Sequence, residues 1–175
     1  MENKKNIYLV GFMGTGKSAV SRELAKRLKR DYFDLDDLIE KKEKRKIRGI
    51  FAQDGEAYFR KIEKEALREV SQSGNLIISC GGGIVLDDEN IEIMKKSGIM
   101  ICLSARPEII LERTAKAGHR PLLNVENPKD KIVDLLKLRA PFYAKADYTI
   151  DCSDLVVAEV ADTIINTVLP HVKPR

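Results

Sequence analysis

Short apolar runs alternate with amphipathic, helix-like segments along the whole chain. Runs of strand length lie at 7–10, 32–35, 76–80, 99–103 and 148–152. Between them, apolar residues recur at intervals of three and four, so that Val20, Leu24 and Leu28 share one face of a helix predicted over 18–29. Strands separated by helices indicate crossover connections, and we therefore expect an α/β fold with a mostly parallel sheet covered on both faces.

The same pattern predicts the remaining helices and the domain organisation. Further helices are expected at 36–43, 46–53, 55–71, 90–96, 107–115, 128–143 and 157–168, with a break near Gly49. The segment 117–127 contains glycine and proline but no periodicity, so we expect a loop there. No repeat or linker divides the chain, which predicts a single domain over 1–175.

Composition and charge exclude several classes of protein. The 175 residues are 43% hydrophobic and 33% charged, as in ordinary globular proteins. No apolar run is long enough to span a bilayer and no secretory signal is visible, so we expect a cytoplasmic protein without a membrane partner. The net charge of +4 is small and its signs are interleaved, which argues against nucleic-acid binding. The basic segment 41–48 is interpreted as a solvated helix face rather than a phosphate-backbone site.

The cysteines have neither the pairing nor the spacing of a disulfide or metal site. Cys80, Cys102 and Cys152 each lie in or beside an apolar run, where a free thiol behaves as a small apolar side chain. We expect all of them to be buried and reduced.

A phosphate-binding loop is the clearest motif. The segment GFMGTGKS follows an apolar strand, opens a helix and matches G-x-x-x-x-G-K-S through Gly11, Gly16, Lys17 and Ser18. Glycines let backbone N–H groups converge on phosphate oxygens; Lys17 would lie along the β- and γ-phosphates, and the Ser18 hydroxyl would face Mg²⁺. The ATP-binding residues predicted from this loop are Gly14, Thr15, Gly16, Lys17, Ser18 and Ala19.

Carboxylates gather where the second strand meets the next helix. Asp34 and Asp36 are two residues apart and could face one cleft if the strand is still extended there. Such a carboxylate could hold metal-bound water or accept a proton from an alcohol. Helix capping is the alternative for Asp36, and it is the favoured interpretation for Asp37.

Two further features concern an anionic acceptor. Arg60 lies between Glu56 and Glu63 at helical spacing, either as a surface ion-pair ladder or as an arginine held by carboxylates to receive an anion. The consecutive glycines 81–83 follow the third strand; they form a tight turn or allow the backbone to approach a ligand closely, and their position favours the ligand.

The order of the motifs resembles the bacterial-type shikimate kinase family. GFMGTGKS is followed by D-L-D, G-E-x-x-F-R-x-x-E, GGG, H-R-P-L-L and R-A-P-F-Y-A-K-A-D, over residues 9–151. The resemblance implies a three-layer P-loop fold with a five-stranded parallel sheet in the order 2-3-1-4-5. It also implies a substrate-binding region at about 34–62, a mobile lid at about 113–127, and ATP with Mg²⁺ as the donor to shikimate.

The resemblance also implies the roles of individual residues. Asp36 would accept the proton of the reacting hydroxyl, with Lys17 and the lid residue Arg120 neutralising the moving phosphoryl group. Arg113 would flank the adenine, with the loop 152–155 at its edge, and Asp34 would help Ser18 to hold Mg²⁺. The acceptor would be bound by Asp36, Arg60, Glu63, Gly81, Gly82, Gly83 and Arg139. Ser79 stands where other P-loop proteins carry a metal-binding aspartate, as is usual in this family.

The alternatives within and outside the kinase class share fewer of these motifs. Gluconate kinase and nucleoside monophosphate kinases are the rival enzymes, and a nucleotide-binding module without transferase activity is the rival of another class. Such a module needs no carboxylate placed to take a proton, and Asp36 and Arg60 are both present. We expect a monomer that binds small molecules only.

Overall fold

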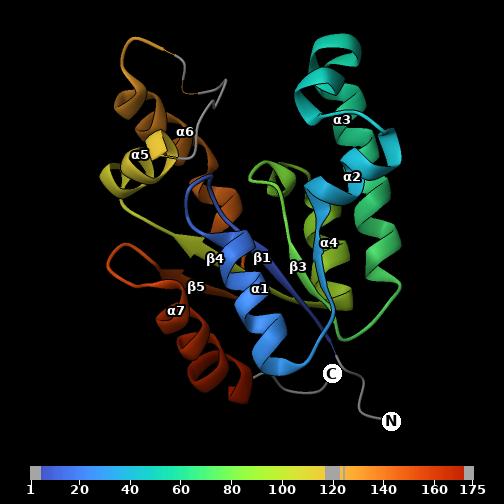
Figure 1. Cartoon of the computed structure of the whole chain (residues 1–175), viewed down its shortest axis with the longest axis vertical. Helices are drawn as coiled ribbons and strands as arrows, with labels where there is room; N and C mark the ends of the chain where they lie inside the picture. The colour runs from blue at the N-terminus through green and yellow to red at the C-terminus, as the bar shows by residue number, and fades with distance from the viewer. Residues whose placement is uncertain (1–4, 117–122, 124, 172–175) are drawn as a thin grey trace.

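One parallel sheet organises the chain. The structure is a computed structural model that describes residues 5–116, 123 and 125–171. Its strands are β1 (Asn6–Val10), β2 (Tyr32–Asp34), β3 (Ile77–Ser79), β4 (Gly98–Ser104) and β5 (Tyr148–Asp151). They form a five-stranded sheet in the order β2-β3-β1-β4-β5, and every pairing is parallel (Figure 1). The fold class and strand order predicted from the sequence are confirmed.

The helices cover both faces of this sheet. They are α1 (Lys17–Leu28), α2 (Leu35–Glu43), α3 (Ile47–Ser71), α4 (Asp88–Ser97), α5 (Pro107–Lys116), α6 (Pro128–Tyr143) and α7 (Val157–Thr163). The short turns η1 (Ile84–Leu86), η3 (Ile164–Val168) and η4 (Leu169–His171) complete the described elements.

Alternate residues of the central strand enter separate cores. Ile7 and Leu9 pack in the cluster that includes residues of α1 and α7, whereas Tyr8 and Val10 pack in the cluster that includes α3 and α4. This alternation follows from the period of two in a strand. The result is three layers, with the sheet in the middle.

The carboxyl ends of the strands lie at one edge of the sheet. Figure 1 shows α2 and α3 on one side of this edge, α5 and α6 on the other, and the loop between β1 and α1 between them. Ligands of open parallel sheets bind beyond this edge. No helix among the described residues is long and apolar enough to cross a membrane.

The predicted helix break near Gly49 is wrong. Gly49 lies in the first turn of α3, where its N–H donates to the Lys46 carbonyl at 2.8 Å, and glycine there does not interrupt the helix. The break falls instead at Gly55, with φ 80° and ψ 176°, a conformation essentially confined to glycine. The helix predicted to begin at Gly55 therefore corresponds to the part of α3 beyond this kink.

The cap of α2 also differs from the prediction. Asp34, and neither Asp36 nor Asp37, caps the helix: its Oδ1 accepts from Asp36 N at 3.1 Å and from Asp37 N at 3.5 Å. The strand ends one residue earlier than expected, so the capping position moves back to Asp34. Asp36 and Asp37 occupy the first helical turn, where carboxylates favour the positive end of the helix dipole.

The three cysteines are as the sequence predicts. Cys80, Cys102 and Cys152 are free and buried, as predicted.

Of the predicted lid at 113–127, Arg113 to Lys116 form the last turn of α5. Residues 117–122 and 124, which include Arg120, lie outside the described residues.

Candidate active site

The loop between β1 and α1 is shaped to receive an anion. Gly11, Gly14 and Gly16 have φ of 138°, 76° and 91°, which favour glycine. A side chain at Gly11 would overlap the carbonyl oxygen of Leu103. Gly16 is the N-cap of α1 and has no side chain that could accept a hydrogen bond from the first N–H groups of this helix, so these groups stay open beside the loop. Open N–H groups and the helix dipole together favour phosphate at this position.

One cavity joins this loop to three of the predicted acceptor residues, Asp36, Gly81 and Gly82, whereas Arg60, Glu63, Gly83 and Arg139 are not in its lining. It has a volume of about 280 Å³ and lies at the carboxyl ends of the strands. Its lining consists of Met13, Gly14, Gly16, Lys17, Ser18, Ala19, Asp34, Asp36, Ser79, Cys80, Gly81 and Gly82. Thr15 is the predicted loop residue that does not line it, because its buried hydroxyl donates to the Phe12 carbonyl at 2.8 Å. Lys17 Nζ donates to the same carbonyl at 2.9 Å.

Hydroxyl and carboxylate oxygens cluster beside the loop. Ser18 Oγ donates to Asp34 Oδ2 at 2.7 Å and lies 3.2 Å from Ser79 Oγ. The Tyr32 hydroxyl donates to the same Asp34 oxygen at 3.2 Å. All of the atoms in this cluster that could bind a metal are oxygens, and only one of the side chains is a carboxylate. This set fits Mg²⁺, which usually takes one or two carboxylates and completes its shell with phosphate oxygens and water.

The Asp36 carboxyl group has a strongly perturbed environment in this cavity. Its pKa is raised from 3.8 to about 6, chiefly by burial and then by the charges of Asp34 and Glu63, against the opposing charge of Lys17. Its backbone N–H donates to Asp34, the N-cap of α2, while its side chain lines the cavity. Asp36 Oδ1 lies 3.2 Å from where a Cβ of Gly81 would stand, so a side chain at Gly81 would crowd it.

Arg60 is held between the carboxylates of Glu56 and Glu63. Its Nη1 lies 2.7 Å from Glu63 Oε2, and its Nη2 lies 3.2 Å from Glu56 Oε1. Glu63 is only 1% exposed, so this is more than the surface ladder considered from the sequence. Burial raises the pKa of Glu63 against the lowering effect of Arg60. A side chain at Gly83 would overlap the guanidinium, which explains why the turn is glycine at this point.

Arg139 reaches the glycine turn from the other side. It projects from α6, and its Nη1 lies 3.4 Å from the Gly82 carbonyl oxygen. The guanidinium carbon lies 5.5 Å from the centre of the Phe12 ring, a cation–π contact that orients the group. Arg60 and Arg139 thus flank the turn formed by residues 81–83.

Arg113, which was predicted to flank the adenine, does not line this cavity. Arg113 Nη2 donates to the Cys152 carbonyl at 2.8 Å, at the end of β5. The loop that follows is held by Arg106, which forms a bidentate pair with Asp154 at 2.7 and 2.8 Å. Arg120 lies outside the described residues, so its position is not part of the observed site.

The sequence did not single out three supporting residues. These are Phe12, Tyr32 and Tyr143, which contact Arg139, Asp34 and Gly82 respectively. Spacing offered a signal for two of them. Tyr32 is two residues before Asp34 in a strand, hence on the same face, and Tyr143 is four residues after Arg139 in a helix. Phe12 had no comparable signal.

The fold and the site define the class of a P-loop phosphotransferase whose phosphate loop shares one polar cavity with Asp36 and the glycine turn. The shikimate kinase family model matches residues 13–169. A shikimate kinase of Thermoanaerobacter pseudethanolicus is 47% identical over 161 residues, which cover 92% of this chain and 94% of the relative. The chain belongs to the shikimate kinase family.

Solved structures agree with this assignment. The shikimate kinase of Acinetobacter baumannii in complex with shikimate superposes with a TM-score of 0.91 at 40% identity, covering 98% of this chain and 97% of that one. The shikimate kinase of Aquifex aeolicus gives a TM-score of 0.80 at 35% identity, covering 94% and 96%.

Proposed function

We propose that this chain transfers the γ-phosphoryl group of ATP to the 3-hydroxyl of shikimate, forming shikimate 3-phosphate and ADP in aromatic amino-acid biosynthesis. Membership of the shikimate kinase family supports this activity. One observation carries the assignment of the site: the phosphate loop, Asp36 and the glycine turn line a single cavity. Donor and acceptor can therefore meet there.

The donor half binds and neutralises phosphate. Lys17 and the N–H groups at the start of α1 are assigned to the β- and γ-phosphates. Ser18 and Asp34 are assigned to Mg²⁺, with Ser79 and Tyr32 supporting them through hydrogen bonds. When bound, Mg²⁺ would add neutralising charge at the phosphates. From the family resemblance, Arg113 is assigned to the adenine and Arg120 to the transferring group.

The acceptor half binds a carboxylate and orients one hydroxyl. Arg60 and Arg139 flank the glycine turn and are assigned to the carboxylate of shikimate, with Glu63 fixing Arg60. The backbone of residues 81–83 is assigned to the ring substituents. Asp36 accepts the hydroxyl proton as the phosphoryl group arrives, and a pKa of about 6 leaves it ionised at neutral pH. We further place the protein in the cytoplasm as a monomer.

An acceptor panel tests the proposal. ADP release is measured in a coupled assay with ATP and Mg²⁺ plus shikimate, gluconate, AMP or no acceptor. Of the acceptors, we expect only shikimate to give a rate above the blank. Lys17→Met, which removes the charge in the phosphate loop, should abolish this rate. Equal rates with shikimate and with no acceptor would contradict the proposal, and a rate with gluconate or AMP alone would favour a rival kinase.

A further inference from the structure

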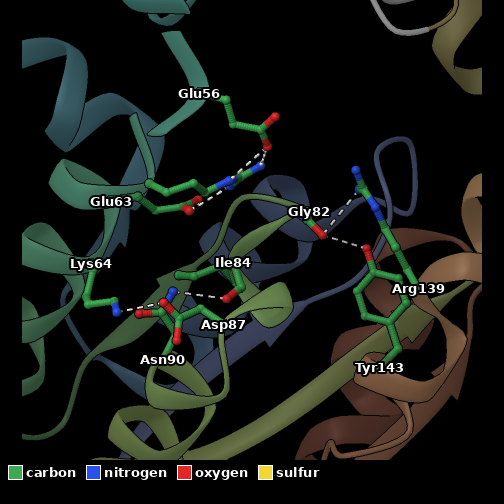
Figure 2. A network of polar contacts seen from close by, with 10 residues as sticks. Glu56, Glu63, Lys64, Gly82, Ile84, Asp87, Asn90, Arg139 and Tyr143 are labelled. Atoms are coloured by element: carbon green, nitrogen blue, oxygen red, sulfur yellow. Dashed lines mark hydrogen bonds and ion pairs between the residues drawn. The ribbon is translucent and has the colours of Figure 1, made fainter. Parts of the chain in front are cut away.

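The Gly82 carbonyl accepts from two side chains of the same helix (Figure 2). The Tyr143 hydroxyl donates to it at 2.7 Å, whereas Arg139 Nη1 donates at 3.4 Å. A distance of 2.7 Å is typical of a well-formed O–H···O bond, and 3.4 Å is long for N–H···O. Tyr143 is therefore the main partner of this carbonyl, and Arg139 is bound to it only weakly.

Tyr143 is built to act as a donor at this point. It is 9% exposed, and a buried tyrosine hydroxyl requires a hydrogen-bond partner. Burial raises the pKa of Tyr143 to about 12, so the hydroxyl keeps its proton throughout the working pH range.

Arg139 keeps most of its donors for another group. It is 9% exposed, and among the described residues no carboxylate forms an ion pair with it. A guanidinium has five N–H donors in a planar fork that matches a carboxylate. Besides the Phe12 ring and the neighbouring Tyr143 side chain, Arg139 has one long hydrogen bond to a carbonyl, so donors of this buried arginine are left to receive an anion.

The glycine turn is anchored independently at its far end. Asn90, buried in α4, donates from Nδ2 to the Ile84 carbonyl at 3.0 Å (Figure 2). On its other side, a Cβ at Gly82 would stand 3.3 Å from the Gly11 carbonyl oxygen. The turn is therefore held between α4 and the phosphate loop, and the loss of one hydroxyl would leave the Gly82 carbonyl directed at α6.

We infer that Tyr143 is a positioning residue for Arg139: its hydroxyl occupies the Gly82 carbonyl and so leaves the guanidinium open to the acceptor's carboxylate. Without that hydroxyl, Arg139 is the remaining side-chain donor to this partly buried carbonyl, and a carbonyl shielded from water favours being paired. A charge-assisted bond would draw the guanidinium onto the turn, and the carboxylate would have to displace it. This inference rests on the proposed function, which gives the acceptor a carboxylate.

Tyr143→Phe tests the inference, because phenylalanine keeps the ring and removes only the hydroxyl. We expect the KM and the calorimetric Kd for shikimate to rise about five- to twentyfold, with kcat and the KM for ATP changed less than about twofold. The split between the two substrates is the decisive readout, since a general loss of stability would not favour one of them.

Tyr8→Phe is the matched control. Tyr8 is fully buried, and its hydroxyl lies 2.6 Å from Ser97 Oγ at the opposite end of the sheet. It should lower Tm about as much as Tyr143→Phe while leaving every kinetic constant near the wild-type value. If the KM and Kd for shikimate are unchanged in Tyr143→Phe, the inference is overturned and the proposed function stands. The same holds if kcat and both KM values change in parallel in Tyr143→Phe and Tyr8→Phe. A wild-type enzyme inactive on shikimate would instead overturn the proposed function and the inference with it.

Discussion

Replacing Asp36 with asparagine should stabilise the protein while removing most of its activity. The pKa of Asp36 rises from 3.8 to about 6 on folding, mainly through burial and then through Asp34 and Glu63. At about 1.4 kcal/mol per unit, ionised Asp36 costs about 3 kcal/mol of folding free energy. The asparagine side chain carries no charge, so we expect Asp36→Asn to gain about 1–3 kcal/mol at pH 7.5, the lower values reflecting water in the open cavity.

The extra stability of Asp36→Asn relative to wild type should increase with pH. Below about pH 3.8 the carboxyl group is protonated in both the folded and unfolded states, and the variant has no advantage. The advantage should grow between about pH 4 and 6, as the unfolded state releases its proton first. Above about pH 6 both states are ionised and the difference is constant.

Urea denaturation at pH 4.5 and 7.5, with ADP release measured in parallel, tests this reasoning. We expect kcat to fall about 10²-fold or more if Asp36 is the base. Asp37→Asn is the matched control, since it removes an equal charge from an exposed position in the same helical turn. Equal stability of Asp36→Asn and wild type at pH 7.5, or a gain independent of pH, would refute the electrostatic argument. Near-normal turnover would refute the assignment of Asp36 as the base.

Three further outcomes follow from the geometry. The kcat/KM for shikimate should fall about tenfold per pH unit below about pH 6, as Asp36 is protonated in the free enzyme, and a flat profile from pH 5 to 8 would contradict this. Gly83→Ala, which places a Cβ against the Arg60 guanidinium, should raise the KM for shikimate about tenfold or more, whereas Gly49→Ala meets open space and should leave it unchanged; equal KM values in both would count against the role of Arg60. Ser18→Ala should weaken calorimetric binding of ADP with Mg²⁺ by about 10-fold or more but leave binding of ADP with EDTA unchanged, and an equal loss in both would mean that Ser18 does not serve the metal.

Periodicity predicted most of the fold because it reports burial directly. The strands enter two apolar cores, and the helices alternate with them as the pattern indicated. The errors fall where burial is uninformative. Gly49 and Gly55 look alike in the sequence, and only the geometry of α3 decides which of them takes a positive φ. The cap of α2 was misplaced because adjacent aspartates compete for one position, and the end of β2 decides between them.

The site was predictable where residue type limits the chemistry. The phosphate loop and the glycine run require backbone conformations or close approaches that other residues do not readily allow, and they lie beside one cavity. The supporting contacts were less predictable because they join distant parts of the chain. Phe12 meets Arg139 only through the packing of α6 against the loop, and no local pattern encodes that contact.

Identification of the phosphorylated product tests the central claim most directly. The claim is that the phosphate loop, Asp36, Gly81 and Gly82 line one cavity. Arg60 and Arg139, which flank the glycine turn, would hold the acceptor's carboxylate so that a single hydroxyl meets the donor. ATP and shikimate are incubated with the enzyme and Mg²⁺, and the product is assigned by ³¹P and ¹H NMR. We predict shikimate 3-phosphate alone, in amounts equal to the ADP formed. A mixture of positional isomers, or ADP accompanied only by inorganic phosphate, would contradict the account.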